Sequence, residues 1–153
     1  MSRTSAGHKA SAVVEELLRV RMIPDPDAAR NFVSSKLRTR FTGGRDMQDP
    51  ARCSAFNAGR CAWVKKRRER TDAIAGARDQ EAIVFSTGMM YGQLPDGTPF
   101  EGNRNVDRYA VSEGLIVSLD VWNDSAEWLL VRAQVADAWP APARSAQNAA
   151  TNP

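Results

Sequence analysis

Histidine and cysteine are scarce in this chain of 153 residues. It contains one histidine, His8, and two cysteines, Cys53 and Cys61, which are not arranged as a CxxC pair. A Cys/His zinc site and a histidine-based catalytic triad therefore cannot be built from these residues, so we expect no metal and no cofactor. Any catalysis is left to carboxylates and to hydrogen-bonding side chains.

Long apolar runs are also missing. No stretch approaches the roughly 20 apolar residues that cross a bilayer, and the first ten residues have no apolar core of the signal-peptide type. We expect a cytoplasmic protein without a membrane partner. The hydrophobic fraction of 42% and the charged fraction of 25% are those of an ordinary globular domain. We place one domain at residues 10–131, between a disordered segment at 1–9 and a flexible tail at 132–153.

Positive charge is in slight excess, and it is concentrated. The net charge is +3, and residues 65–70 read Lys-Lys-Arg-Arg-Glu-Arg. This run is compatible with a phosphate-binding patch. It is also compatible with a solvated strand or helix end, which we favour because Glu69 interrupts the run and Trp63 is the one aromatic residue near it. Nucleic acid is therefore not expected as a partner.

Hydrophobic periodicity places helices first and strands later. The helices are predicted at residues 11–22, 27–35 and 50–60, and the strands at residues 37–42, 62–74, 82–91, 100–111 and 115–122. This order predicts an α+β fold, in which three N-terminal helices pack on the concave face of a cone-shaped, curved and mostly antiparallel sheet.

The last two strands form a β-hairpin around the Glu113-Gly114 turn. Asn103, Asn105 and Asp107 share one parity of the first hairpin strand with Tyr109, so one face of the sheet mixes polar and apolar groups. A face that only served a core would not carry these amides and this carboxylate. The pattern indicates the wall of a pocket.

The motifs of this hairpin resemble those of the SnoaL-like branch of the nuclear transport factor 2-like superfamily. The matching residues are Gly102, Arg108, Tyr109, Val111, Glu113, Gly114, Ile116, Asp120, Trp122 and Asp124, and the turns at residues 41–44 and 94–97 fit as well. The resemblance covers roughly residues 10–131. It implies a cavity between the sheet and the helices, and a homodimer. It leaves the activity open, because the superfamily includes isomerases, cyclases, epoxide hydrolases, dehydratases and non-catalytic binders.

The same resemblance implies which residues line the cavity. They are Phe41, Trp63, Phe85, Thr87, Met89, Asn103, Asn105, Tyr109, Leu119, Val121 and Asn123, together with Asp107 and Tyr91 as candidate catalytic residues. The Asp-Arg-Asp arrangement of the epoxide hydrolases would fall at Thr87, Met89 and Val121, which cannot ionise at neutral pH. An epoxide hydrolase of that type is therefore excluded.

Asp107 is then the candidate acid or base, because a carboxyl group in an apolar pocket is suited to proton transfer. Tyr91 or Tyr109 would donate a hydrogen bond to a developing enolate oxygen. The alternative is that Asp107 forms a structural polar pair with Arg104, with Arg108 or with a group on a neighbouring strand. Two functions follow: a small cofactor-independent isomerase, cyclase or dehydratase acting on a partly apolar carbonyl or polycyclic molecule, or a non-catalytic module that binds a small apolar or aromatic ligand. A homodimer through the outer face of the sheet is expected in both cases.

Overall fold

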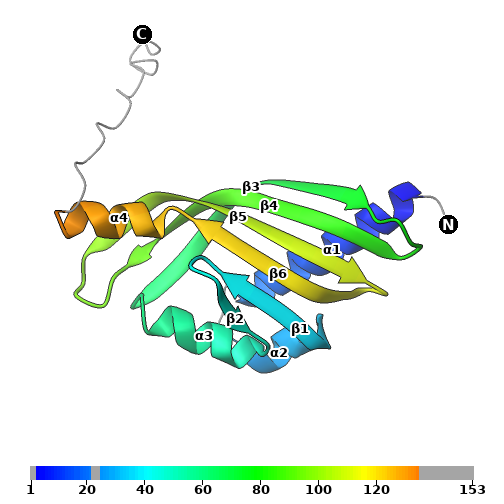
Figure 1. The fold of residues 1–153 in the computed structure, drawn as a ribbon, viewed down its shortest axis with the longest axis horizontal. Helices are drawn as coiled ribbons and strands as arrows, with labels where there is room; N and C mark the ends of the chain where they lie inside the picture. Colours follow the sequence, from blue (N-terminus) through cyan, green and yellow to red (C-terminus); the bar gives the residue numbers. More distant parts are fainter. Residues whose placement is uncertain (1–2, 22–24, 135–153) are drawn as a thin grey trace, which may run out of the picture.

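The computed structural model describes residues 3–21 and 25–134 as one α+β domain (Figure 1). In chain order the elements are α1 (Arg3–Arg21), α2 (Pro26–Arg30), β1 (Val33–Phe41), β2 (Arg45–Met47), α3 (Pro50–Ala58), β3 (Trp63–Ala75), β4 (Glu81–Gln93), β5 (Pro99–Ser112), β6 (Leu115–Asn123) and α4 (Ser125–Arg132). The strands form a single sheet in the order β2-β1-β6-β5-β4-β3, and all neighbours are antiparallel except β1 and β6. The predicted α+β fold is confirmed.

Helix α1 runs along one face of the sheet and packs on β3 and β4, while α2 and α3 lie near β1 and β2 (Figure 1). The core lies between α1 and this face, where Val14, Val84, Tyr109 and Ile116 are fully buried. None of the helices in the described part of the chain is long and apolar enough to cross a membrane.

Two glycines of β4 allow β3 to come close to its neighbour. A side-chain Cβ added at Gly88 would lie 2.3 Å from the carbonyl oxygen of Arg67, and one added at Gly92 would lie 2.3 Å from that of Trp63. Any other residue at these positions would collide with the backbone of β3. The register of β3 also shifts between Arg68 and Arg70, and such a bulge increases the local twist. The sheet therefore curves strongly at this edge.

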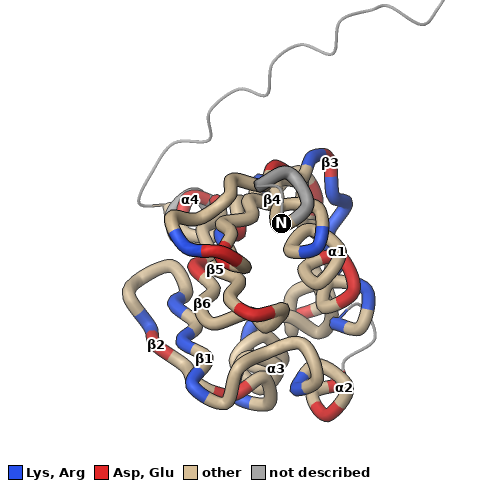
Figure 2. The backbone as a smooth tube through the Cα atoms, turned by 90° about the vertical axis from the view of Figure 1, so that its right-hand side faces the viewer, with Lys and Arg blue, Asp and Glu red and all other residues tan. Residues whose placement is uncertain are grey.

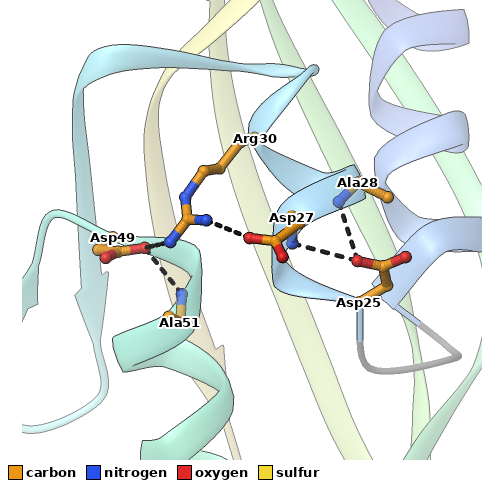
Figure 3. A network of polar contacts seen from close by, with 6 residues as sticks. All are labelled: Asp25, Asp27, Ala28, Arg30, Asp49 and Ala51. Carbon is orange, nitrogen blue, oxygen red and sulfur yellow. Dashed lines mark hydrogen bonds and ion pairs between the residues drawn. The ribbon is translucent and has the colours of Figure 1, made fainter.

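Helices α2 and α3 are held together by a small polar network (Figure 3). Asp25 accepts hydrogen bonds from the first turn of α2, and Asp49 accepts one from Ala51 N at 2.9 Å in the first turn of α3. Arg30 forms ion pairs with Asp27 and, at 3.4 Å, with Asp49. Asp25 and Asp49 each cap the N-terminus of a helix, a position that aspartate prefers. The network positions α3 beside the sheet.

Several element boundaries differ from the prediction; β1, for example, begins at Val33 and not at residue 37. Helix α1 begins at Arg3, so residues 3–9 are helical rather than disordered, whereas the helix predicted at 27–35 ends at Arg30 because the chain enters β1 at Val33. The short strand β2 and the helix α4 were not predicted. Both are too short to show a clear period in the sequence. The predicted tail lies outside the described residues from residue 135 onward.

Candidate functional site

A cavity of about 750 Å³ opens between the concave face of the sheet and helices α1, α3 and α4. Its apolar wall comes from both layers and consists of Leu18, Phe41, Phe56, Val64, Met90, Leu94, Phe100, Val121 and Leu129. Phe41 and Phe56 pack against each other with ring centroids 4.7 Å apart. The space is large enough for a small polycyclic molecule and is mostly apolar, as small-molecule sites usually are.

Strand alternation on β5 and β6 places the predicted polar residues on this concave face. Asn105 lies opposite Asn123 and Asp107 opposite Val121 in the ladder, and the glycine at position 102, with a φ of 85°, forms a bulge that also turns Phe100 inward. Six of the predicted ligand-binding residues line the cavity: Phe41, Thr87, Asn103, Asn105, Val121 and Asn123. Tyr109 and Leu119 lie on the same face, in the core beside the cavity.

The parity predicted for β4 is wrong. Ala82, Val84, Ser86 and Gly88 are the buried side of this strand, so Phe85, Met89 and Tyr91 lie on the opposite, convex face. Thr87 has the same outward parity, although part of it touches the cavity. Large residues were expected inside, but the concave side of a curved strand next to α1 has room for small side chains.

Trp63 also lies on the convex face. It is 45% exposed and packs edge to face on Tyr91, with ring centroids 6.0 Å apart. It therefore does not close the cavity, and Tyr91 is not near Asp107.

Asp107 is 1% exposed and forms an ion pair with Lys66 of β3. The hydroxyl of Tyr109 donates a second hydrogen bond to the same carboxylate oxygen, Oδ2, at 3.2 Å. Burial raises the pKa of Tyr109 well above its usual value, and the negative charge of Asp107 raises it further, so this tyrosine stays protonated. The other oxygen, Oδ1, has no hydrogen-bond partner among the described residues. Of the two residues in this ion pair, Lys66 lines the cavity and Asp107 does not.

The ion pairs suggested for Asp107 with Arg104 or Arg108 are not formed. Arg104 binds Asp124 at 2.7 Å and Arg108 binds Asp120 at 3.1 Å, both on the convex face. Alternation explains this result, because adjacent residues of a strand point to opposite faces.

The asparagine side chains of the cavity wall differ in their hydrogen bonds. The amide nitrogen of Asn103 donates to the Ser125 hydroxyl at 2.9 Å, and its side-chain oxygen accepts from Asp124 N at 2.9 Å. Asn103 thereby holds the start of α4. Asn105 is 4% exposed, and its side-chain oxygen accepts no hydrogen bond from the part of the chain that the structure describes. A buried polar atom without a partner is costly, so Asn105 is the amide best suited to hydrogen-bond a ligand.

Several lining residues were not predicted. Helix α1 contributes Glu15, Arg19 and Arg21, β3 contributes Lys66 and Arg68, and α3 contributes Phe56 with Asn57. Strand alternation within residues 64–68 could have identified the residues of β3, because Val64, Lys66 and Arg68 lie on one side of the strand. The helical residues depend on tertiary packing and carried no such signal. Within the described ranges, no three His, Cys, Asp or Glu side chains gather to form a metal site.

Comparison with family models and with curated proteins gives no match to the sequence. Solved structures do match. A protein from a Jannaschia species, named as a SnoaL-like polyketide cyclase, superposes with a TM-score of 0.69 at 14% identity, over 85% of this chain and 95% of that one. An NTF2-like protein of unknown function from Burkholderia pseudomallei gives 0.65 at 14% identity, over 84% and 98%. TerC, co-crystallised with polyporic acid, gives 0.62 at 11% identity, over 79% and 95%.

These similarities extend over nearly the whole described domain and over almost all of each matching chain. The predicted resemblance is thereby confirmed at the level of the fold. The chain has the fold of the SnoaL-like and nuclear transport factor 2-like proteins.

Proposed function

We propose that this protein binds a small, partly apolar or aromatic molecule in its cavity, without a cofactor. The observation that carries the proposal is the ion pair between Lys66 and Asp107. Asp107 is the one buried carboxylate of the described domain, and it is already held by Lys66 and Tyr109. A buried carboxylate that is already bound to a lysine and a tyrosine serves to orient the lysine. The wall around the pair, with its apolar residues and the free amide of Asn105, is suited to holding a ligand.

The fold neighbours support the chemical class of the ligand. TerC has a comparable fold and was co-crystallised with polyporic acid, and the Jannaschia protein is named as a polyketide cyclase. Polyporic acid is therefore a reasonable first natural compound to test for binding.

The test uses N-phenyl-1-naphthylamine, a neutral aromatic probe that fluoresces in apolar cavities. Met90 lines the cavity, whereas its neighbour Met89 lies on the convex face. The Met90→Trp variant should fill the cavity and weaken probe binding at least about tenfold, which corresponds to about 1.4 kcal/mol. Met89→Trp is the matched control and should bind as the wild type does. Binding that is equal in the two variants, or absent from the wild type, would contradict the proposal.

The second candidate is an isomerase, cyclase or dehydratase in which Asp107 moves a proton. The free Oδ1 atom of this carboxylate favours it, and Lys66 would then stabilise a developing enolate in the cavity. Tyr91 has no part in this candidate, since it lies on the other face. Asp107→Asn separates the two functions. A rate loss of roughly 10²–10⁴-fold with an unchanged melting temperature indicates catalysis. A lower melting temperature with normal ligand binding indicates the binding protein.

We also propose a homodimer through the convex face of the sheet. Val106 and Trp122 are cross-strand neighbours on this face and are 39% and 49% exposed. Phe85, Met89 and Tyr91 share this side of the sheet with Arg104 and Arg108, so the face combines apolar side chains with arginines, both of which are enriched at protein interfaces. Sedimentation of the wild type and of Trp122→Lys at micromolar concentration tests this interface. A wild type that is monomeric would exclude it.

A further inference from the structure

The basic run at residues 65–70 is divided between the two faces of β3. Arg67 points outward, where it lies 5.6 Å from the ring of Tyr91 and approaches Glu101, and Arg70 binds Asp72 at 2.7 Å. Lys66 and Arg68 face the other side of the sheet and line the cavity. Arg70 lies outward although it is two positions from Arg68, because the register of β3 shifts between these two residues. Figure 2 shows the Lys and Arg positions of β3 in blue. A solvated strand was expected here, and that interpretation holds only for the outward half of the run.

The cations of the cavity exceed its carboxylates. Arg19, Lys66 and Arg132 each have a carboxylate partner in Glu16, Asp107 and Asp96. Arg21, Arg60, Lys65 and Arg68 form no ion pair with any described residue, and Glu15 is the one carboxylate that lines the cavity. Low-dielectric walls strengthen the field of such unpaired charges.

Lys66 and Arg68 lie two positions apart on the inward side of β3, and Arg21 lines the same cavity from α1, which packs on β3. Burial and the charge of Asp107 raise the pKa of Tyr109, and the positive charges of Arg21 and Arg68 oppose that rise, in agreement with this placement. Arg60 is placed differently, with its guanidinium 3.6 Å from the centre of the Phe56 ring. The cavity thus has a cationic end formed by Lys66, Arg21 and Arg68, and an aromatic region around Phe41 and Phe56.

Resting on the proposed binding function, we infer that the ligand is an organic acid: an aromatic or polycyclic body with an ionised oxygen group, such as a carboxylate or an acidic enol. The acidic oxygens bind Arg21, Arg68 and Lys66, and the rings lie against Phe41 and Phe56. Asn105, buried and with a free side-chain oxygen, accepts a hydrogen bond from a hydroxyl of the same ligand. Arginine suits this role because its planar group can bind two oxygens of an acid at once.

The experiment compares two probes with the same ring system. 1-Anilinonaphthalene-8-sulfonate carries a negative charge, and N-phenyl-1-naphthylamine does not. The measured quantity is the ratio of their dissociation constants, anionic over neutral. In Arg21→Gln/Arg68→Gln we expect this ratio to rise roughly tenfold or more, the range expected for charge-assisted hydrogen bonds. High salt should raise the ratio in the wild type as well, since screening affects the anionic probe alone.

The matched control is Arg67→Gln/Arg70→Gln, which removes the same net charge from the convex face and should leave the ratio unchanged. An equal ratio in the wild type and in the cavity variant would overturn the inference, and so would an equal change in both double variants, which indicates attraction to the surface as a whole. If the cavity variant binds neither probe, Arg68→Gln against Arg67→Gln repeats the comparison. Loss of both probes from the wild type would instead refute the proposed function, and this inference with it.

Discussion

Lys66→Met is the substitution that most directly tests the ion pair at the centre of the site. Methionine keeps the apolar length of the lysine side chain and removes its charge. Asp107 would then be 1% exposed without a counter-charge, with Tyr109 as its remaining hydrogen-bond donor. We therefore expect a clear loss of stability.

The expected loss of stability is estimated from the burial of the ion pair. Removing one partner of a buried ion pair costs about 3–5 kcal/mol. The Lys66 side chain is 28% exposed and Tyr109 still donates, so the lower end of this range applies, about 3 kcal/mol. For a domain of this size the melting temperature should fall by on the order of 10 °C. Lys65→Met is the matched control, because Lys65 forms no ion pair with a described residue and should change the free energy of unfolding by less than about 0.5 kcal/mol.

Thermal melts followed by circular dichroism measure both variants at neutral pH. A double-mutant cycle with Asp107→Leu then isolates the coupling, because the double variant removes both charges and should recover part of the loss. A Lys66→Met variant that melts within about 2 °C of the wild type, or a coupling near zero, would refute the ion pair as the role of Asp107.

Three further predictions concern other parts of the fold. Gly88→Ala should cost about 3 kcal/mol or more, since its Cβ would meet the β3 backbone, whereas Gly7→Ala, with its nearest contact at 3.6 Å, should leave the melting temperature unchanged or raise it. Cys61 lines the cavity, so a bound aromatic probe should slow its alkylation, and an unchanged rate would place the probe elsewhere. The pKa of Asp96 is lowered to about 2, mainly by its hydrogen bond from Arg132, so its contribution to stability is complete above about pH 4 and is lost as the pH falls toward 2. NMR titration should find this pKa raised in Arg132→Gln.

The hairpin shows what the sequence alone could predict. Its turn at Glu113-Gly114, its two strands and the inward parity of Asn103, Asn105 and Val121 all agree with the structure, because strand alternation is a local property.

β4 shows where such reasoning fails. Both of its sides contain apolar residues, and we assigned the larger ones, Phe85, Met89 and Tyr91, to the cavity. The curvature of the sheet and the close approach of β3 reverse that choice, and neither is visible from the period of the strand. The partner of Asp107 was missed for a similar reason. Lys66 lies 41 positions away in the sequence, on a strand that is not adjacent to β5.

The close approach of β3 at Gly88 and Gly92 has a consequence for redesign. These two positions have no side chain, so the bend that gives the cavity its width is encoded separately from the side chains that give it its chemistry. Lining residues such as Met90 and Asn105 can then be exchanged for others while the frame stays in place. A new ligand preference could be engineered into this domain by replacing side chains that line the cavity, while both glycines are retained as part of the scaffold.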